Sequence, residues 1–112
     1  MIEEHKFGSF LINGRRFYGD LKIIDSQVKY WSAREKHLLA VKDVKDIVDS
    51  QPQMIVVGKG NSGYLEISQE VKNLCSQNRI ALSTGTNTEA IKKYNQALTE
   101  NKKVAAIFHA TC

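Results

Sequence analysis

The chain has little of what marks a membrane, secreted or fibrous protein. It contains one proline and two cysteines among 112 residues. Apolar runs such as residues 54–57 and 104–108 fall far short of the roughly 20 residues of a membrane-spanning helix. Small secreted domains usually carry about four or more cysteines, so Cys75 and Cys112 are predicted to be reduced thiols. The N-terminus has neither the basic start nor the apolar stretch of a secretory signal, and we expect a cytoplasmic protein with no membrane partner.

A strong excess of one charge is also absent. Hydrophobic residues make up 42% of the chain and charged residues 25%, and the net charge is +4. These values are ordinary for a globular protein, and residues 1–112 are expected to form a single domain. A nucleic-acid-binding surface would need a dense basic stripe with exposed aromatic residues. The lysine pairs at residues 92–93 and 102–103 are instead typical of a solvated helix face, so nucleic acid is not the expected partner.

The first half of the sequence, residues 5–50, has the pattern of short strands and tight turns. Asn13 and Gly14 form the dipeptide best suited to a two-residue hairpin, because both positions tolerate a positive φ. Apolar residues at helical spacing then predict a short helix before Pro52. The predicted strands cover residues 10–12, 15–18, 21–24 and 28–31, and the helix lies within residues 41–48. This half therefore predicts an antiparallel meander of three or four strands followed by one helix.

The second half, residues 53–112, alternates strands and helices. Ser68 is a predicted N-cap, and Thr86 with Glu89 matches the capping box that begins a helix. The predicted strands cover residues 54–57, 80–82 and 104–108. Because right-handed β-α-β crossovers place such strands parallel in one sheet, the whole chain is predicted to be an α+β protein.

The strongest local motif is Gly58-Lys59-Gly60-Asn61-Ser62-Gly63, which fits G-x-G-x-x-G and follows a predicted strand. Dinucleotide-binding folds use these glycines to bring backbone amides to a pyrophosphate at a helix N-terminus. Four residues separate this motif from the Ser68 cap, and Ser83 and Thr84 stand where the ribose-binding acid should be. Tyr64 and Leu65 also replace the Lys and Ser/Thr of a Walker loop. A structural turn is therefore the leading interpretation of the motif.

A weaker anion-binding hypothesis survives. The glycine loop and residues 83–86 both follow predicted parallel strands and lead toward helix N-termini, where unpaired amides attract anions. A small anion or a partner's carboxylate is one predicted ligand, and a solvated lysine beside a simple helix cap is the alternative. The candidate residues are Gly58, Lys59, Gly60, Asn61, Ser62, Gly63, Tyr64, Thr84 and Thr86.

Residues suited to catalysis are few. Cys75 lies in the apolar stripe of its helix and is predicted to be a buried, inert thiol. His109 and Cys112 point to opposite faces of a regular strand, so they could meet only if the chain bends after His109. His5 and His37 sit alone in polar surroundings and are predicted to be exposed. The sequence therefore predicts no catalytic residues, no cofactor and no metal site, although it does not exclude an enzyme.

The chain resembles a small family of unknown function that includes an adipogenesis-associated human protein and a mitochondrial assembly factor for respiratory complex I. The most specific matching segments are the glycine loop through Tyr64 and the C-terminal residues 104–112. The family usually has Thr at the position of Lys59 and Leu at that of Ala110. Further matches are Phe7-Gly8, Asn13-Gly14, Tyr18, Asp20, Trp31, Arg34, His37 and Tyr94-Asn95.

The resemblance implies a three-layer arrangement of sheets and helices and no established catalytic residues. The assembly role belongs to mitochondrial relatives, and this sequence shows no Arg- and Ser-rich leader. We therefore expect a non-enzymatic protein-interaction or assembly module. The alternative is a small-ligand binder or enzyme that uses the glycine loop. Trp31 is predicted either to contact a partner or to pack between the two halves.

Overall fold

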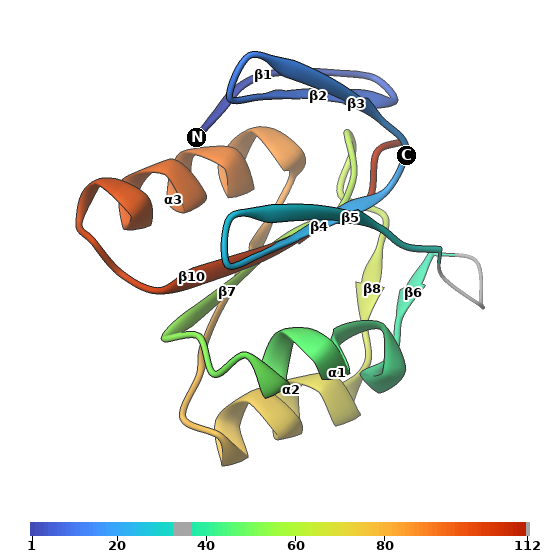
Figure 1. The fold of residues 1–112 in the computed structure, drawn as a ribbon. Coiled ribbons are helices and arrows are strands. Elements are labelled where there is room, and N and C mark those ends of the chain that lie inside the picture. The colour runs from blue at the N-terminus through green and yellow to red at the C-terminus, as the bar shows by residue number, and fades with distance from the viewer. Residues whose placement is uncertain (33–36, 112) are drawn as a thin grey trace.

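The computed structural model describes residues 1–32 and 37–111 and is organised around one mixed five-stranded sheet. The strand order across this central sheet is β5-β4-β10-β7-β9 (Figure 1). The three strands β9, β7 and β10 are parallel. Strand β4 pairs antiparallel with β10, and β5 pairs antiparallel with β4 at the edge of the sheet. The bounds are β4 Leu21–Ile24, β5 Gln27–Tyr30, β7 Met54–Gly58, β9 Ala81–Gly85 and β10 Val104–Phe108.

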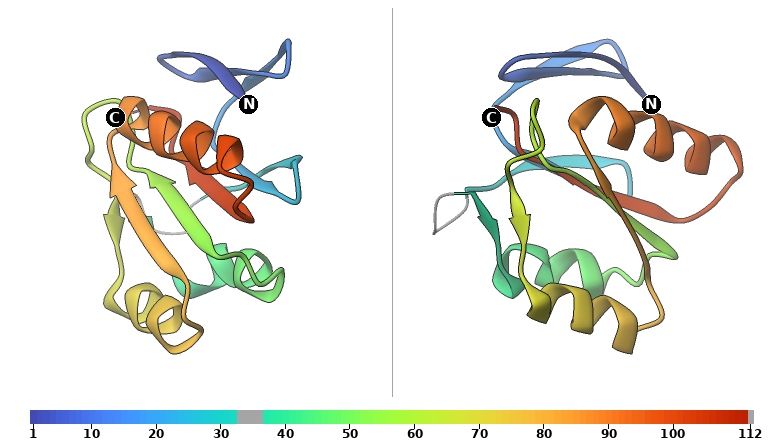
Figure 2. Two further views of the ribbon diagram at one scale, coloured as in Figure 1. Left: turned by 90° about the vertical axis from the view of Figure 1, so that its left-hand side faces the viewer. Right: turned by 180° about the vertical axis from the view of Figure 1, so that it is seen from behind.

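Two layers cover the faces of the central sheet (Figures 1 and 2). The upper layer, at the top of Figure 1, contains an antiparallel three-stranded sheet and the helix α3. The lower layer contains α1 and α2, beside a short parallel pair of β6 and β8. The upper elements are β1 Ile2–Lys6, β2 Ser9–Ile12, β3 Arg15–Tyr18 and α3 Asn87–Thr99, and the lower ones are β6 Leu38–Leu39, α1 Val41–Asp49, β8 Glu66–Ile67 and α2 Gln69–Gln77. The predicted α+β fold with three layers is confirmed.

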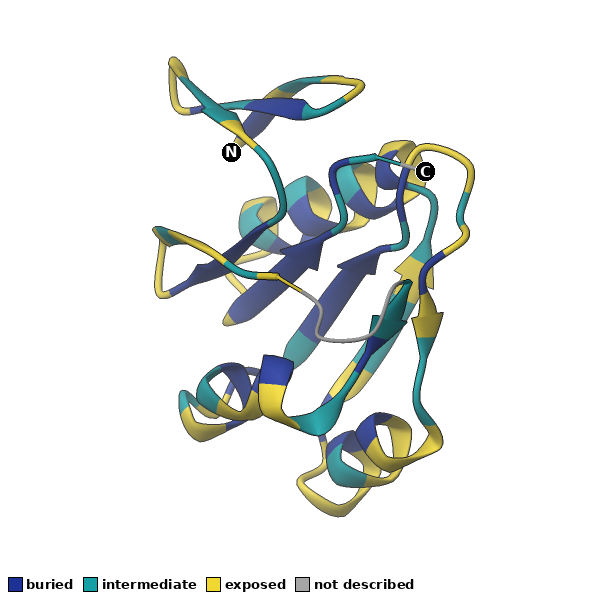
Figure 3. Ribbon diagram, turned by 90° about the vertical axis from the view of Figure 1, so that its right-hand side faces the viewer, coloured by how far each residue is buried: buried dark blue, intermediate teal, exposed yellow. Residues whose placement is uncertain are grey.

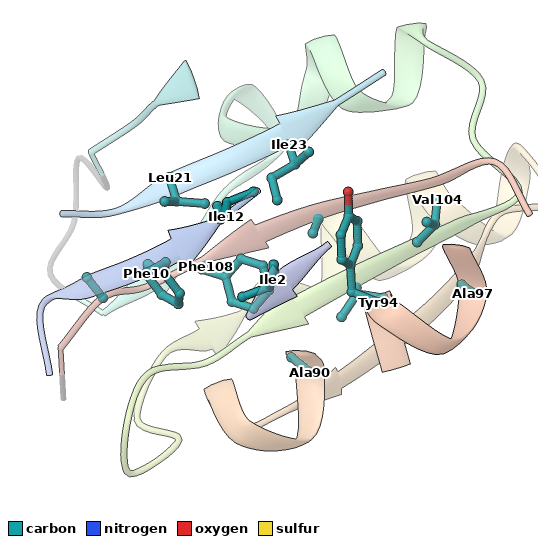
Figure 4. Close-up of a cluster of buried hydrophobic side chains, with 13 residues drawn as sticks. Ile2, Phe10, Ile12, Leu21, Ile23, Ala90, Tyr94, Ala97, Val104 and Phe108 are labelled. Carbon is teal, nitrogen blue, oxygen red and sulfur yellow. The ribbon is translucent and has the colours of Figure 1, made fainter. Parts of the chain in front are cut away.

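The core consists of two clusters, one on each face of the central sheet. Strand β10 is buried along its whole length and contributes alternate residues to both clusters (Figure 3). Phe108 packs into the upper cluster with Phe10, their ring centroids 5.1 Å apart (Figure 4), and Ile107 packs into the lower cluster. This continuous apolar strand fits the rule that parallel strands covered on both faces lose the alternating pattern. The Cα radius of gyration is 12.5 Å, close to the roughly 13 Å of a compact chain of this length.

The predicted hairpin at Asn13-Gly14 is confirmed, with φ values of 50° and 80°. A second two-residue turn, at Asp25 and Ser26 with φ values of 50° and 66°, joins β4 to β5. The meander, however, is divided between two sheets, because β3 and β4 do not pair with each other. Gly19, with a φ of 103°, lies at this change of sheet.

Strand β1 was not predicted from the sequence. Its residues are mostly polar, and only Ile2 of the five is fully buried. The side-chain amide of Asn95 on α3 receives the Ile2 N–H at 2.9 Å and donates to the Ile2 carbonyl at 2.8 Å. A contact across 93 residues thus holds a strand whose own pattern does not predict it.

Candidate functional site

The parallel strands end together at one edge of the molecule, which we call the carboxyl end. Strand β7 ends at Gly58, and the chain after β10 runs beside the loop that follows it. His109 N–H donates to the Gly58 carbonyl at 2.9 Å, and Asn61 N–H donates to the Thr111 carbonyl at 3.3 Å. The turn between β1 and β2 joins them, because Gly8 N–H donates to the Ala110 carbonyl at 3.0 Å. The carboxyl end therefore gathers the glycine loop, the C-terminal residues and the first hairpin.

The first amides of the glycine loop are directed into the protein. Lys59 N–H donates to the Gly85 carbonyl at 2.8 Å, and Gly60 N–H donates to Asn87 Oδ1 at 3.1 Å. With Asn61 bonded to Thr111, three successive loop amides are already used within the fold. An anion at this loop would have to be bound by the exposed tip instead, at Ser62 and Tyr64.

The glycines of the loop have structural reasons of their own. A Cβ at Gly58 would overlap the Phe108 ring and Asn87 Oδ1, so only glycine fits there. Gly60 and Gly63 have φ values of 103° and 79°, in the region that favours glycine. Close packing and a tight turn thus account for all three positions.

Thr86 is placed next to the loop, whereas Thr84 is exposed on β9. A Cβ at Gly63 would lie 3.6 Å from Thr86 Cγ2, so the loop tip crosses the start of α3. The predicted capping box is present: Thr86 Oγ1 accepts from Glu89 N–H at 3.4 Å, and Glu89 Oε1 accepts from Thr86 N–H at 2.9 Å. The Thr86 amide holds the pKa of Glu89 below its usual value. Since this carboxylate occupies the helix N-terminus, it opposes a second anion there.

A cluster of polar side chains that the sequence analysis did not predict lies beneath the C-terminal residues. His109 Nδ1 lies 3.2 Å from Asp20 Oδ1, and the same oxygen accepts the Ala110 N–H at 2.7 Å. The His109 ring also meets the His37 ring edge to face, with centroids 5.5 Å apart. Asp20 and His109 are 89 positions apart, and only their closeness in the fold reveals the pair.

His5 belongs to the same end through Asn87. The buried Asn87 amide nitrogen donates to the His109 carbonyl at 2.8 Å and lies 3.3 Å from His5 Nε2. The His5 ring packs on Phe10, with centroids 5.1 Å apart, and burial lowers the pKa of His5. The prediction that His5 and His37 are exposed was wrong, since both are partly buried.

The His109–Asp20 pair is enclosed rather than open to a substrate. Both ring nitrogens of His109 have almost no accessible surface, and the Nδ1 contact with Asp20 is close without being a well-aligned hydrogen bond. Cys112, which was expected to meet His109 only if the chain bends after His109, lies outside the described residues. Both ring nitrogens of His109 are therefore turned away from solvent, and the hydrogen bond that holds the C-terminal residues here is the one from Ala110 N–H to Asp20 Oδ1.

Aromatic side chains are exposed on the surface of the carboxyl end. Three of its large side chains are mostly exposed: Phe7 (69%), Tyr18 (70%) and Tyr64 (68%). Phe7 precedes the Gly8 that bonds to Ala110, and Gly19, next to Tyr18, donates to the Gly8 carbonyl at 2.9 Å. Tyr64 follows the loop that bonds to Thr111. We call these three side chains the aromatic end.

Other predicted residues are structural. Trp31 is half-buried against the lower cluster, and its Nε1–H donates to the Phe108 carbonyl at 3.0 Å, which favours packing over partner contact. Cys75 is a free, buried thiol whose pKa is raised by burial. Within the described ranges, no three His, Cys, Asp or Glu side chains are placed to hold a metal ion. No helix in those ranges is long and apolar enough to cross a membrane.

These features define a small mixed sheet protein from a class with no assigned function. The chain belongs to the family described as "Protein of unknown function (DUF498/DUF598)", whose model matches residues 2–109. It is similar to the solved structure named MT938, with 27% identity, a TM-score of 0.85 and coverage of 100% of this chain and 98% of that one.

Two further solved structures have the same fold. The conserved hypothetical protein PH1505 from Pyrococcus horikoshii OT3 is 26% identical, with a TM-score of 0.85 and coverage of 100% of this chain and 99% of that one. A Bordetella pertussis protein described as an Mth938-like domain is 14% identical, with a TM-score of 0.69 and coverage of 97% of this chain and 84% of that one. At that identity the likeness concerns the fold alone.

Proposed function

We propose that this protein is a non-enzymatic interaction module and that the aromatic end is its contact surface. The observation that carries the proposal is the exposure of Phe7, Tyr18 and Tyr64 around the same C-terminal residues. Large aromatic side chains supply much of the binding energy of protein interfaces, and tyrosine, with its apolar ring and polar hydroxyl, is enriched there. The enclosed His109 favours binding over catalysis. The sequence resemblance to a family with an assembly factor supports the same class of function.

A rigid support distinguishes the aromatic end from a set of unrelated surface residues. The three side chains come from separate segments, and each segment bonds directly or through Gly8 to residues 108–111. A preformed surface loses little conformational entropy when a partner binds, which increases affinity. The free thiol of Cys75 is compatible with the cytoplasm as the proposed location.

Site-specific photocrosslinking in cells tests this proposal. A benzophenone amino acid is placed at Tyr18, at Tyr64 or, as the matched control, at the exposed Lys72 on α2. We expect one discrete protein adduct that Tyr18 and Tyr64 share and Lys72 lacks, and loss of the Tyr64 adduct in a Phe7→Ser/Tyr18→Ser background. Absence of an adduct at both tyrosines, or the same adduct from Lys72, would contradict the proposal.

The alternative function is binding of a small anion at the tip of the glycine loop. It is supported by the closeness of Gly63 to Thr86 and by the cationic Lys59 in the same loop. Titration with phosphate, sulfate and nucleotides, followed by amide NMR, tests it. Saturable shifts at Ser62, Gly63 and Tyr64 would support this function, whereas unchanged amides there would eliminate it.

A further inference from the structure

A groove of about 460 Å³ opens on the side of the molecule where the upper layer meets the central sheet. The β2–β3 hairpin forms one wall and the β4–β5 hairpin the other; both hairpins project to the same side in Figure 3. Its apolar base is a continuation of the upper core cluster. The lining residues are Ile12, Asn13, Arg15, Phe17, Ser26, Gln27 and Val28. We call this site the edge groove.

The edge groove is bordered by a strand with an unused pairing edge. β5 is the outermost strand of the central sheet, and within residues 1–32 and 37–111 no strand pairs with its outer side. Trp31 N–H donates to the Asp20 carbonyl, which fixes the alternation of hydrogen bonds along the β4–β5 ladder. In an antiparallel ladder, every second residue directs its N–H and C=O groups outward. Counting back from Trp31, the outward groups belong to Val28 and Tyr30.

Of these two residues, Val28 lines the edge groove and Tyr30 lies beside it. Val28 packs against the upper core cluster, and the Tyr30 ring lies 6.5 Å from the ring of the lining residue Phe17. A strand added to β5 would therefore direct every second side chain into the groove. An exposed edge with free backbone groups is the usual template for such strand addition.

The positive charge of Arg15 in the edge groove favours a ligand with an acidic side chain. The Arg15 guanidinium lies over the Phe17 ring, 5.3 Å from its centroid. Among the described residues Arg15 has no carboxylate partner, whereas its neighbour Arg16 pairs with Glu4 at 3.4 Å. Arg15 and Phe17 are two positions apart on β3 and so share a face. A matching ligand has an acidic and a large apolar side chain at the same spacing.

We propose that the edge groove binds an extended segment of a partner protein as an additional strand on β5. An Asp or Glu of that segment pairs with Arg15, and a large apolar side chain two positions away packs on Phe17. Backbone hydrogen bonds to Val28 and Tyr30 supply the sequence-independent part of the affinity. This interaction uses none of the three side chains of the aromatic end.

Selection from a random heptapeptide display library tests this proposal. Wild-type protein, Arg15→Glu and the control Lys45→Glu on α1 are the baits, since Lys45 is exposed on the opposite layer. We expect wild type and Lys45→Glu to enrich peptides with Asp or Glu two positions from a large apolar residue. Arg15→Glu should instead enrich Lys or Arg at that position. Failure to enrich peptides, or the same enriched pattern with Arg15→Glu, would overturn the proposal.

Amide NMR with the best acidic peptide supplies the structural readout. We expect Val28 and Tyr30 amides to shift and become protected from hydrogen exchange, with affinity reduced about tenfold or more in Arg15→Glu. A peptide that shifts only other amides would overturn the strand addition. Benzoate and octanoate are added separately, and binding of these acids with affinity equal to the peptide would show a small-carboxylate site instead. We expect the photocrosslinked adducts of Tyr18 and Tyr64 to be unchanged in the Arg15→Glu variant. The edge groove and the aromatic end are therefore tested independently of each other.

Discussion

The two layers that cover the central sheet are held by different kinds of interaction. In the lower layer, α1 and α2 pack through apolar side chains such as Ile47 and Val71. Lys22 of β4 adds polar contacts to this layer: its Nζ donates to the Asp43 carbonyl at 3.0 Å and to Asp46 Oδ1 at 2.9 Å. The upper layer also has an apolar core, but buried or partly buried amides from Asn87 and Asn95 join its segments.

The difference follows from where the segments lie in the sequence. The lower helices are close in the sequence to the strands that they cover, and short loops keep them in place. The upper layer combines residues 2–18 with residues 87–99, from opposite ends of the chain. Apolar packing alone is not directional, so polar contacts are needed to fix the register of such distant segments. The aromatic end and the edge groove both include residues of this upper layer, Phe7 and Tyr18 in the first and Arg15 and Phe17 in the second.

The largest expected effect on stability comes from shortening a buried side chain of β10, the middle strand of the central sheet, first on one face and then on the other. Phe108→Ala removes a fully buried ring from the upper cluster, and Ile107→Ala removes a fully buried side chain from the lower one. We expect losses in the free energy of unfolding of about 3–5 and about 2–5 kcal/mol. Hydrogen exchange should then increase first in β1–β3 for Phe108→Ala and first in α1 and α2 for Ile107→Ala. The same exchange pattern in both variants would contradict the separation of the layers.

Removal of a buried side-chain amide that joins segments of the upper layer should have the next largest effect on stability. Asn87→Ala leaves the Gly60 N–H and the His109 carbonyl without their partner, at a cost of about 2–4 kcal/mol. Urea unfolding measures this change. Asn73→Ala, at an exposed position of α2, is the matched control and should change stability by less than about 0.5 kcal/mol. Equal effects of the two substitutions would show that the upper layer does not depend on its buried amides.

The N-caps of α3 in the upper layer and α2 in the lower layer allow a second comparison, in which the expected changes in stability are smaller. Thr86→Ala and Ser68→Ala each remove an N-cap, and each should cost about 1 kcal/mol. Only Thr86 is in a capping box, so its loss should be the larger. Because the pKa of Glu89 is lowered in the folded state, its contribution is present above the usual carboxyl pKa and is lost as pH falls through that range. The stability difference between wild type and Glu89→Gln should accordingly diminish below about pH 4; a constant difference would contradict it.

The smallest expected effect is the pH response of His5. Burial lowers its pKa in the folded protein, so the unfolded chain binds the proton more tightly. Its contribution to stability is therefore present above the usual histidine pKa and is lost as pH falls below it. Urea unfolding between pH 7.5 and 5, values that span the usual pKa of about 6.5, should show a flatter profile for His5→Gln than for wild type. Parallel profiles would show that His5 is equally solvated in both states.

The predictable part of the fold is the part whose pattern is local. β7, β10 and the three helices were predicted because their apolar spacing and caps lie within a few residues of one another. The pairing of Leu38–Leu39 with Glu66–Ile67 was not predicted, since two residues are too few to carry a periodic pattern. The pairing of β4 with β10 was not predicted for another reason. Strand order depends on which strand edge remains unpaired after the rest of the sheet has formed, and a local sequence pattern does not show this.

The candidate site was predictable to a similar degree. The glycine loop and the Thr86 cap were located correctly, but the direction of the Lys59 and Gly60 amides depends on Gly85 and Asn87. The pairing of Asp20 with His109 could not be predicted, because the two residues lie 89 positions apart in separate segments and only the fold brings them together. The exposure of Tyr18 and Tyr64 also could not be predicted, since tyrosine is common both inside and outside proteins.

The amino-acid sequence alone determined most of the helices and strands, the turn at Asn13-Gly14 and the apolar strand β10, which must be covered on both faces. These depend on φ preferences and on the spacing of apolar side chains along a few neighbouring residues. Only the tertiary structure decided which hairpin joins the central sheet, which histidines are enclosed and which aromatic rings remain in water. Those outcomes depend on contacts between residues about ninety positions apart, such as Asn95 with Ile2, and no local pattern encodes such a distance.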